Sequence, residues 1–227
     1  MSGDESGSLP SRVVIRPYPS VIYFYPTLIA ALAAGLYMHF TVGDVPPADL
    51  LLNPGPVGLI FTLLFFFNLS VVAFDYTRLT SIVVVLVVVI VGLLSSIYPQ
   101  IQNMIQSLLK QHLFMNSTFY FVWAIGFAMI FIAVFVKVRF NYWEIKNNEL
   151  LHHHGFLGDV ERWPAPQMRI SKEISDVIEY VLIRGGRLVL IPSGERRAIV
   201  LDNVPNISKV EARMQHILST LRVADGD

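Results

Sequence analysis

Long apolar stretches fill much of the first half of the chain, and short runs of mixed character fill the second. Four stretches approach or exceed the length of about 20 apolar helical residues that a bilayer core requires. They span residues 21–42, 57–74, 79–97 and 118–136. Lipid cannot hydrogen-bond the backbone, so even the β-branched run Ile82–Val91 is predicted to be helical. The pattern predicts a four-helix transmembrane domain over residues 20–137.

Three further features belong to this region. Between the third and fourth stretches, Ile101–Phe114 has apolar residues at helical spacing, which predicts a helix lying on the membrane interface or a short capping helix. Polar Thr62, Asn68 and Ser70 in the second stretch are expected to form hydrogen bonds between helices rather than a ligand site. Small residues suited to helix packing occur in the first stretch, at Ala30, Ala31, Ala34 and Gly35.

Basic residues predict the orientation, because Lys and Arg are enriched in cytoplasmic loops. The flanks and loop assigned to the cytoplasm carry Arg12, Arg16, Arg78, Lys137, Arg139 and Lys146. The first loop has no basic residue and the third has only Lys110. This distribution places both termini in the cytoplasm and the protein in the cytoplasmic (inner) membrane. Residues 1–19 are expected to be a disordered cytoplasmic tail.

Residues 138–227 have the pattern of a small polar domain. Phe140–Lys146 and Glu149–His154 flank Asn147-Asn148, a pair suited to a tight turn between antiparallel strands. Three more strands are predicted, at Val177–Ile183, Arg187–Ile191 and Arg196–Leu201, with Gly185-Gly186 as the turn between the first two of these. An amphipathic helix over residues 206–221 then presents one apolar face to the predicted sheet.

Several antiparallel strands closed by one C-terminal helix resemble a pleckstrin-homology (PH) fold, and the opening of this region is similar to bacterial PH-like domains. The matching positions are Tyr142, Glu144, Ile145, Asn147, Asn148, Leu150, Leu151, Gly155, Phe156, Leu157 and Gly158, followed by Ile174–Val177 and Arg187–Leu190. The resemblance covers residues 138–227 only. Trp163–Pro166 departs from the pattern, because its prolines are expected to break the strand usual there.

The resemblance implies a non-enzymatic bacterial inner-membrane protein. Its PH-like domain would dock a protein partner or the membrane surface, and the chain would act as an accessory or assembly subunit of a membrane complex. The expected partners are membrane lipids and other membrane protein subunits. The alternative is a component of an oligomeric channel or transporter, in which helices from several copies form the path.

The amino-acid composition agrees with a membrane domain followed by a polar domain, and it excludes several types of ligand and reaction. Of 227 residues, 54% are hydrophobic and 15% are charged, whereas soluble proteins have about 25% charged residues. The formal net charge is zero, so nucleic-acid binding is not expected. Cysteine is absent, which excludes disulfides and thiolate chemistry. No motif for hydrolysis, phosphate binding or metal catalysis occurs, so neither an enzyme nor a cofactor is predicted.

Histidines in one predicted strand are weak candidates for metal binding. In His152-His153-His154, alternation along a strand puts only His152 and His154 on the same face. The sequence offers no second cluster to complete a coordination shell, so a packed or solvated strand is the favoured interpretation and no metal is predicted.

Four arginines surround two predicted turns of the polar domain. These are Arg184, Arg187, Arg196 and Arg197. Together they could contact anionic headgroups, each contributing about 1 kcal/mol near the surface. The alternative is an ordinary charged rim, since Glu179 and Glu195 offset part of the charge.

Overall fold

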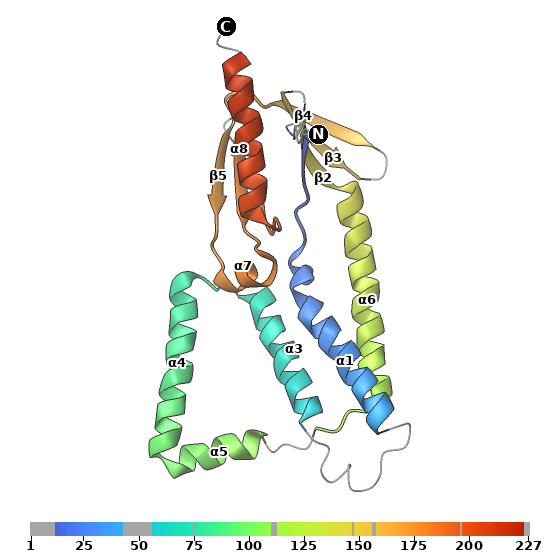
Figure 1. Ribbon diagram of the computed structural model, residues 1–227, viewed down its shortest axis with the longest axis vertical. Helices are drawn as coiled ribbons and strands as arrows, with labels where there is room; N and C mark the ends of the chain where they lie inside the picture. The colour runs from blue at the N-terminus through green and yellow to red at the C-terminus, as the bar shows by residue number, and fades with distance from the viewer. Residues whose placement is uncertain are drawn as a thin grey trace, which may run out of the picture. The chain divides into compact units, whose positions relative to one another are not determined.

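The computed structural model describes residues 12–42, 56–74, 76–109, 113–146, 148–155, 158–195 and 197–224. Figure 1 follows the chain from a short N-terminal strand through a series of helices to the remaining strands, among which one short helix lies, and to a final helix. The chain forms two compact units. The helical unit comprises Ser20–Ala133 and Asp176–Ile178, and the two-sheet unit comprises Met1–Pro19, Val134–Ser175 and Glu179–Asp227.

Helices make up most of the described part of the helical unit. They are η1 (Ser20–Phe24), α1 (Tyr25–Thr41), α3 (Val57–Ala73), α4 (Arg78–Ile97), α5 (Pro99–Leu109) and α6 (Ser117–Phe140), whose last turns belong to the two-sheet unit. Three helical segments are long and apolar enough to cross a membrane: Ser20–Thr41, Arg78–Ile97 and Ser117–Phe140. The apolar helix α3 is shorter, with 17 residues. The four expected helices are therefore present, and the prediction of a helix within Ile101–Phe114 is confirmed by α5.

Helices α1, α3 and α6 pack together through small and aromatic side chains. Their shared core contains Ala31, Ala34, Met38, Phe61, Tyr120 and Ala124. A Cβ atom added at Gly35 would lie 3.0 Å from the Phe121 ring, so the glycine allows α1 and α6 to approach closely. The small residues predicted to pack between helices do so here.

One of the expected interhelical hydrogen bonds is present. Asn68 Nδ2 donates to Thr27 Oγ1 over 2.6 Å, and both side chains are buried. Thr62 and Ser70 instead donate to carbonyl groups of their own helix, at Gly58 and Phe67. The prediction is therefore confirmed for Asn68, but Thr62 and Ser70 do not donate to another helix. A short hydroxyl side chain bonds to the preceding turn of its own helix, whereas the longer amide of Asn68 reaches the neighbouring helix.

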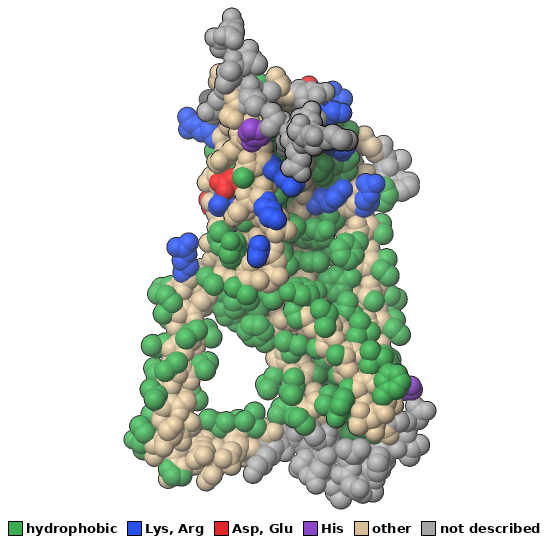
Figure 2. All heavy atoms as spheres, in the orientation of Figure 1, with side chains coloured by type: hydrophobic (Ala, Val, Ile, Leu, Met, Phe, Trp, Pro, Cys, Tyr) green, Lys and Arg blue, Asp and Glu red, His purple; other side chains and the backbone are tan. Residues whose placement is uncertain are grey.

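Helix α4 differs from its neighbours. None of its 20 residues, all of them described, is buried, and its mean hydropathy of 2.8 is the highest of the candidate spans. Hydrophobic side chains project along its length in Figure 2. The helix begins where Thr77 caps it by accepting the Thr80 N–H.

The described residues of the two-sheet unit form seven strands in two antiparallel sheets. Sheet A has the order β1 (Arg12–Ile15), β2 (Tyr142–Lys146), β3 (Glu149–His154) and β4 (Asp159–Pro164). Sheet B has the order β5 (Arg169–Glu173), β6 (Arg187–Ile191) and β7 (Ile199–Leu201). Helix α7 (Val177–Ile183) lies between β5 and β6 in sequence, and α8 (Ile207–Ala224) follows β7.

The predicted β2–β3 hairpin is confirmed, with Asn148 at φ 64°. Asn147 lies outside the described residues. Strand β1 pairs with β2 in the register Val13↔Ile145 and Ile15↔Trp143. The expectation of a disordered tail is therefore wrong for Arg12–Ile15, because Val13 and Ile15 are buried in the core of the two-sheet unit.

Two predictions about the strands are also wrong. Val177–Ile183 is helix α7 rather than a strand, because Asp176 caps the helix by accepting the Ile178 N–H at 2.7 Å. Gly185-Gly186 therefore joins a helix to β6 instead of turning a hairpin. By contrast, β4 ends at Pro164, the first proline of Trp163–Pro166, as expected of a segment that breaks the strand; β4 is an edge strand, where a terminal proline is tolerated.

Helix α8 closes the core of the two-sheet unit. Ile207, Met214 and Leu218 are buried against residues from both sheets, including Leu150 and Leu190. A sheet with one apolar face and a helix with one apolar stripe bury those surfaces together, which is the main driving force for folding in water. The predicted helix and its apolar face are confirmed.

Candidate functional site

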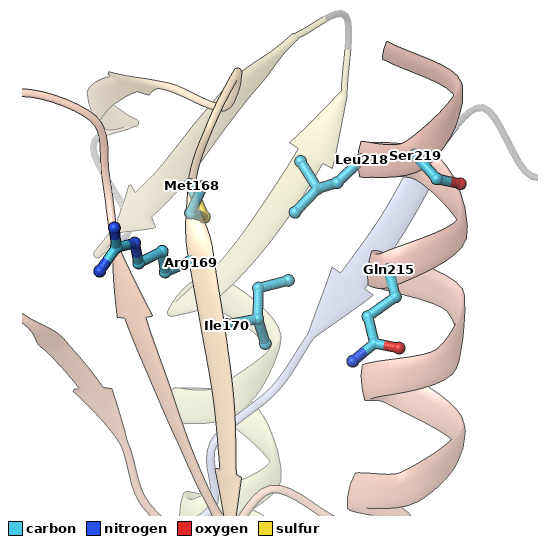
Figure 3. A pocket seen from close by; sticks show the side chains of 6 residues that line it. All are labelled: Met168, Arg169, Ile170, Gln215, Leu218 and Ser219. Carbon is cyan, nitrogen blue, oxygen red and sulfur yellow. The ribbon is translucent and has the colours of Figure 1, made fainter. Parts of the chain in front are cut away.

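A groove lies between the start of β5 and the second half of α8 (Figure 3). Its volume is about 460 Å³. The described residues that line it are Met168, Arg169, Ile170, Gln215, Leu218 and Ser219. One wall is the extended backbone at the start of β5 and the other is a helix.

The floor of the groove is apolar and its rim is polar. Met168 and Leu218 are buried in the core, and Ile170 is partly buried against it. Gln215 and Ser219 are exposed on α8. This distribution, with an apolar centre and polar margins, is the composition found in protein-binding surfaces.

Core packing and one ion pair fix the distance between β5 and α8. Side chains alternate along β5, so that Ile170 and Lys172 are partly buried while Arg169, Ser171 and Glu173 are exposed. Lys172 Nζ lies 2.5 Å from Glu211 Oε2 on α8. The pair joins the strand to the helix beyond the groove and keeps the groove walls in register.

Strand β5 is an edge strand. Among the described strands it is hydrogen-bonded only to β6, in the register Ile170↔Leu190 and Lys172↔Leu188. Its other edge therefore presents backbone N–H and C=O groups that no described strand pairs. Such an edge is a template for another extended chain unless it is covered.

One cation borders the groove on the other face of β5. Arg169 is exposed, points away from α8 (Figure 3) and makes no ion pair with any described residue. The other five described lining residues carry no formal charge. The described lining therefore offers an apolar floor and a backbone edge, with one cation across the strand.

The arginines expected to form one basic rim occupy two ends of strand β6. Arg184 follows α7, and Arg187 begins β6, where its Nε donates to Asp202 Oδ1 over 2.6 Å. Arg197 comes after the opposite end of β6, beyond Ile191. Arg196 lies outside the described residues. The described arginines are thus separated by the length of a strand, and one of them is already paired with a carboxylate.

The histidine triplet alternates as the strand pattern predicts. His152 and His154 share one face of β3, with ring centroids 5.1 Å apart. Register puts Glu161 opposite His152 and Asp159 opposite His154. Among the described residues, however, no group of three histidines or carboxylates is arranged to hold a metal ion. His112, a further candidate ligand, lies outside the described residues.

His152 is held in place by its neighbours. Its ring stacks on Trp143, with centroids 4.0 Å apart, and its Nε2 lies 3.0 Å from Asn141 Oδ1. Burial lowers the pKa of His152 below its usual value of 6.5, against a smaller opposing effect of the Glu161 carboxylate. The ring therefore favours its neutral form and serves as a packing surface for Trp143.

A buried carboxylate lies on β2; it matches the PH-like pattern, but the sequence assigns it no role. Glu144 is 4% exposed, and its two oxygens lie 2.7 and 3.0 Å from Arg12 Nε and Nη2 on β1. His153 Nε2 is 3.3 Å from the same carboxylate, but its orientation makes no hydrogen bond with a described group. The two-pronged Arg12–Glu144 pair ties the N-terminal strand to the rest of sheet A.

Neither the groove nor the Arg12–Glu144 pair has a motif in the sequence. The alternation of Arg169–Glu173 is the one local signal for β5, and it contains too few apolar residues to predict a strand. Arg12 and Glu144 are separated by the whole apolar region, so only the pairing of β1 with β2 brings them together.

Comparison with known proteins finds no relative for this chain. No protein-family model matches it, and neither does any curated protein or solved structure. The groove, the edge strand and the apolar helices are therefore the basis for assigning a function.

Proposed function

We propose that this chain is a non-enzymatic, multi-pass bacterial inner-membrane protein whose two-sheet unit docks a protein partner on the cytoplasmic side. It would serve as an accessory or assembly subunit of a membrane complex. The main observation behind the proposal is that the two-sheet unit has an open groove beside a free strand edge. This unit is built from segments that precede and follow the apolar region.

The pairing of β1 with β2 supports four membrane crossings. Strand β1 precedes the first apolar helix and β2 follows the last, yet they are hydrogen-bonded neighbours. A sheet cannot form across a bilayer, so the chain between them must cross an even number of times. Three helical segments meet the length for a span, and α3, with 17 residues, is at the lower limit of about 17 to 25. Counting α3 as a span gives the even number.

Basic residues support a cytoplasmic location for both termini. Arg12 and Arg16 precede the first apolar helix, and Lys137 and Arg139 are in the last turn of α6. The positive-inside rule puts such flanks in the cytoplasm. Because β1 and β2 share a sheet, one orientation applies to both ends of the apolar region.

The strand order supports the PH-like assignment of this unit. Two antiparallel sheets of four and three strands are followed by a C-terminal helix that packs on them. This is the plan that the sequence resemblance implies. The chain differs from a continuous domain in that β1 is separated from β2 by all the apolar helices.

Docking of a protein is favoured over docking of headgroups because the described arginines do not gather in one place. Arg187 is neutralised by Asp202, and Arg197 lies beyond the other end of β6. By contrast, the groove combines an apolar floor, a polar rim and unpaired backbone groups in one place. Contact with lipid would then be a secondary role of the arginines.

Crosslinking in intact membranes followed by purification of the full chain in detergent tests the proposal. A second membrane protein should co-purify in constant ratio, and it should be lost when Phe140–Asp227 is deleted while the truncated chain still enters the membrane fraction. Recovery of the isolated chain alone, from crosslinked and uncrosslinked membranes, would refute the proposal.

The exposure of α4 favours a second candidate function. A 20-residue apolar helix with no buried residue suits contact with helices of other copies, as in an oligomeric channel or transporter component. Ion or solute flux through vesicles containing only this purified chain would favour this candidate over the first. Absence of flux together with a co-purifying partner would favour the first.

A further inference from the structure

We infer that the groove between β5 and α8 binds an extended segment of the partner protein as an additional strand on the free edge of β5. The inference rests on the proposed docking function and names its chemistry. The bound segment would carry an apolar side chain for the floor of the groove and an acidic side chain for Arg169.

The shape of the groove selects an extended chain. Its strand-side wall is an edge whose backbone groups are paired by no described strand, and its helix-side wall is α8. A peptide lying along β5 would pair its own N–H and C=O groups with that edge, and these hydrogen bonds do not depend on sequence. The five residues of β5 extend over about 17 Å at roughly 3.3 Å per residue, enough for about five peptide residues.

The lining selects the side chains. Alternate residues of an added strand point to the same side, so every second residue of the bound segment would face the floor formed by Met168, Ile170 and Leu218. Burial of one apolar side chain there contributes to affinity. The groove therefore requires at least one Leu, Ile, Val, Met or Phe in the segment.

The charge of Arg169 indicates which kind of residue lies next to the apolar residue of the bound segment. Arg169 is the one charged residue among the six described residues that line the groove, and it has no ion-pair partner among the described residues. Its side chain points away from α8, on the opposite face of β5 from Ile170 (Figure 3). Neighbouring residues of an added strand also point to opposite faces, so a residue next to the one that faces the floor would lie on the Arg169 side, where an acidic side chain would meet this cation.

A phage-displayed library of random linear peptides of about 10 residues, selected on the detergent-solubilised full chain, tests the inference, because about five residues suffice to cover β5. Enriched peptides should share an apolar residue with an acidic neighbour. Binding should slow hydrogen exchange at the alternate backbone amides of Arg169–Glu173 that point away from β6. Bound peptides that leave these amides unprotected, or a library without enrichment, would overturn the inference.

Two variants separate the groove from the rest of α8. Gln215→Trp places an indole in the groove and should weaken the selected peptides by about tenfold or more, the effect of blocking a central contact. Arg213→Trp, at an exposed position of α8 outside the lining, is the matched control and should bind as the wild type does. Equal binding by the two variants would contradict the inference.

A third variant tests the role of charge. Arg169→Glu should reverse the selection, so that enriched peptides carry basic in place of acidic residues. If the selected charge does not change, Arg169 does not face the bound segment and the stated partner chemistry is wrong. If Gln215→Trp converts a dimer of this chain to a monomer, the groove binds a second copy, which also overturns the inference.

The co-purified complex distinguishes this inference from the proposed function. If the partner is retained by Gln215→Trp, docking occurs elsewhere, so the groove inference fails and the proposed function stands. If no partner co-purifies with the wild type while the selected peptides still protect β5, the proposed function fails and the groove remains a strand-binding site.

Discussion

The helical unit and the two-sheet unit bury their apolar side chains in opposite ways. In the two-sheet unit, residues such as Ile15, Leu150 and Ile207 are fully buried, and the exposed surface is mostly polar. In the helical unit, most large apolar side chains of α4 and many of α6 face outward. Buried apolar side chains are typical of a domain folded in water, whereas outward-facing apolar side chains suit a lipid environment.

The difference shows which interactions hold each unit together. The hydrophobic effect stabilises the two-sheet unit, so removing a buried apolar side chain from its core should lower the free energy of unfolding. In lipid that driving force is absent between helices, so close packing and a few buried hydrogen bonds position α1, α3 and α6. Substitutions at matched positions in the two units should therefore have different consequences.

The largest expected effect is that of Leu190→Ala in β6. Leu190 is fully buried, so the substitution should lower the free energy of unfolding by about 2 to 5 kcal/mol. Urea unfolding of the detergent-solubilised chain, followed by tryptophan emission, measures it. In a Trp123→Phe background the remaining two of the chain's three tryptophans, Trp143 and Trp163, lie in sheet A.

Val85→Ala on α4 is the matched control for that substitution. Val85 is 63% exposed, so the change should alter stability by less than about 0.5 kcal/mol. A comparable loss in both variants would mean that α4 is packed against another surface and that the contrast between the units is false.

The next largest effect is expected for Arg12→Ala, which tests whether β1 is a structural part of the two-sheet unit. The substitution leaves the Glu144 carboxylate buried without its cation, and should cost about 1 to 3 kcal/mol. This is below the full cost of breaking a buried pair, because the Arg12 side chain is 51% exposed. Hydrogen exchange of Val13–Ile15 should accelerate in parallel.

Arg162→Ala provides the comparison for Arg12. Arg162 pairs with Glu149 over 3.6 Å, and both side chains are exposed, so its loss should cost less than about 0.5 kcal/mol. If the two substitutions have the same effect, the buried position of Glu144 does not matter to the attachment of β1.

Asn68→Ala is expected to have a smaller effect, confined to the helical unit. It removes the buried hydrogen bond to Thr27 and should destabilise the packing of α3 on α1 by about 0.6 to 2 kcal/mol. Unfolding by increasing amounts of sodium dodecyl sulfate, followed by circular dichroism, measures the change. Thr62→Val should cost less, since Thr62 donates to a carbonyl of its own helix. The reverse order would indicate that Asn68 does not join the two helices.

The smallest expected effect concerns pH and is absent at neutral pH. Burial lowers the pKa of His152, so the unfolded chain takes up its proton near pH 6.5 while the folded chain remains neutral. The contribution of His152 is thus fully present above pH 6.5 and is lost as the pH falls through 6.5 towards the lower pKa of the folded state. His152→Phe, which keeps the stack on Trp143, should flatten stability against pH in that window.

Glu161→Gln should have the opposite effect on the pH dependence. The Glu161 carboxylate raises the pKa of His152, so its removal should lower that pKa further and steepen the loss of stability below pH 6.5. Unfolding free energies measured at a series of pH values check both variants. A flatter profile for Glu161→Gln would show that the carboxylate does not act on His152.

Local patterns in the sequence suffice to predict most of the individual helices and the β2–β3 hairpin. Uninterrupted apolar runs predict helices wherever lipid or length excludes a strand, and the bounds of α1, α3, α4 and α6 agree with the predicted stretches to within a few residues. The β2–β3 hairpin followed from its Asn-Asn turn, and α8 from its apolar face. Each of these signals lies within about 20 contiguous residues, where hydrophobic period and turn chemistry decide the outcome.

Strand pairing between distant segments was decided only by the tertiary structure. Arg12–Ile15 has three β-branched residues, but so short a run is not stable as a strand alone, and it becomes one because Tyr142–Lys146 offers it an edge and an apolar core to cover. Val177–Ile183 has the composition of a strand, yet the Asp176 cap begins a helix there. The groove likewise exists because α8 packs beside an edge strand nearly 40 residues away in sequence. Such features depend on contacts between distant residues, and a local pattern does not contain them.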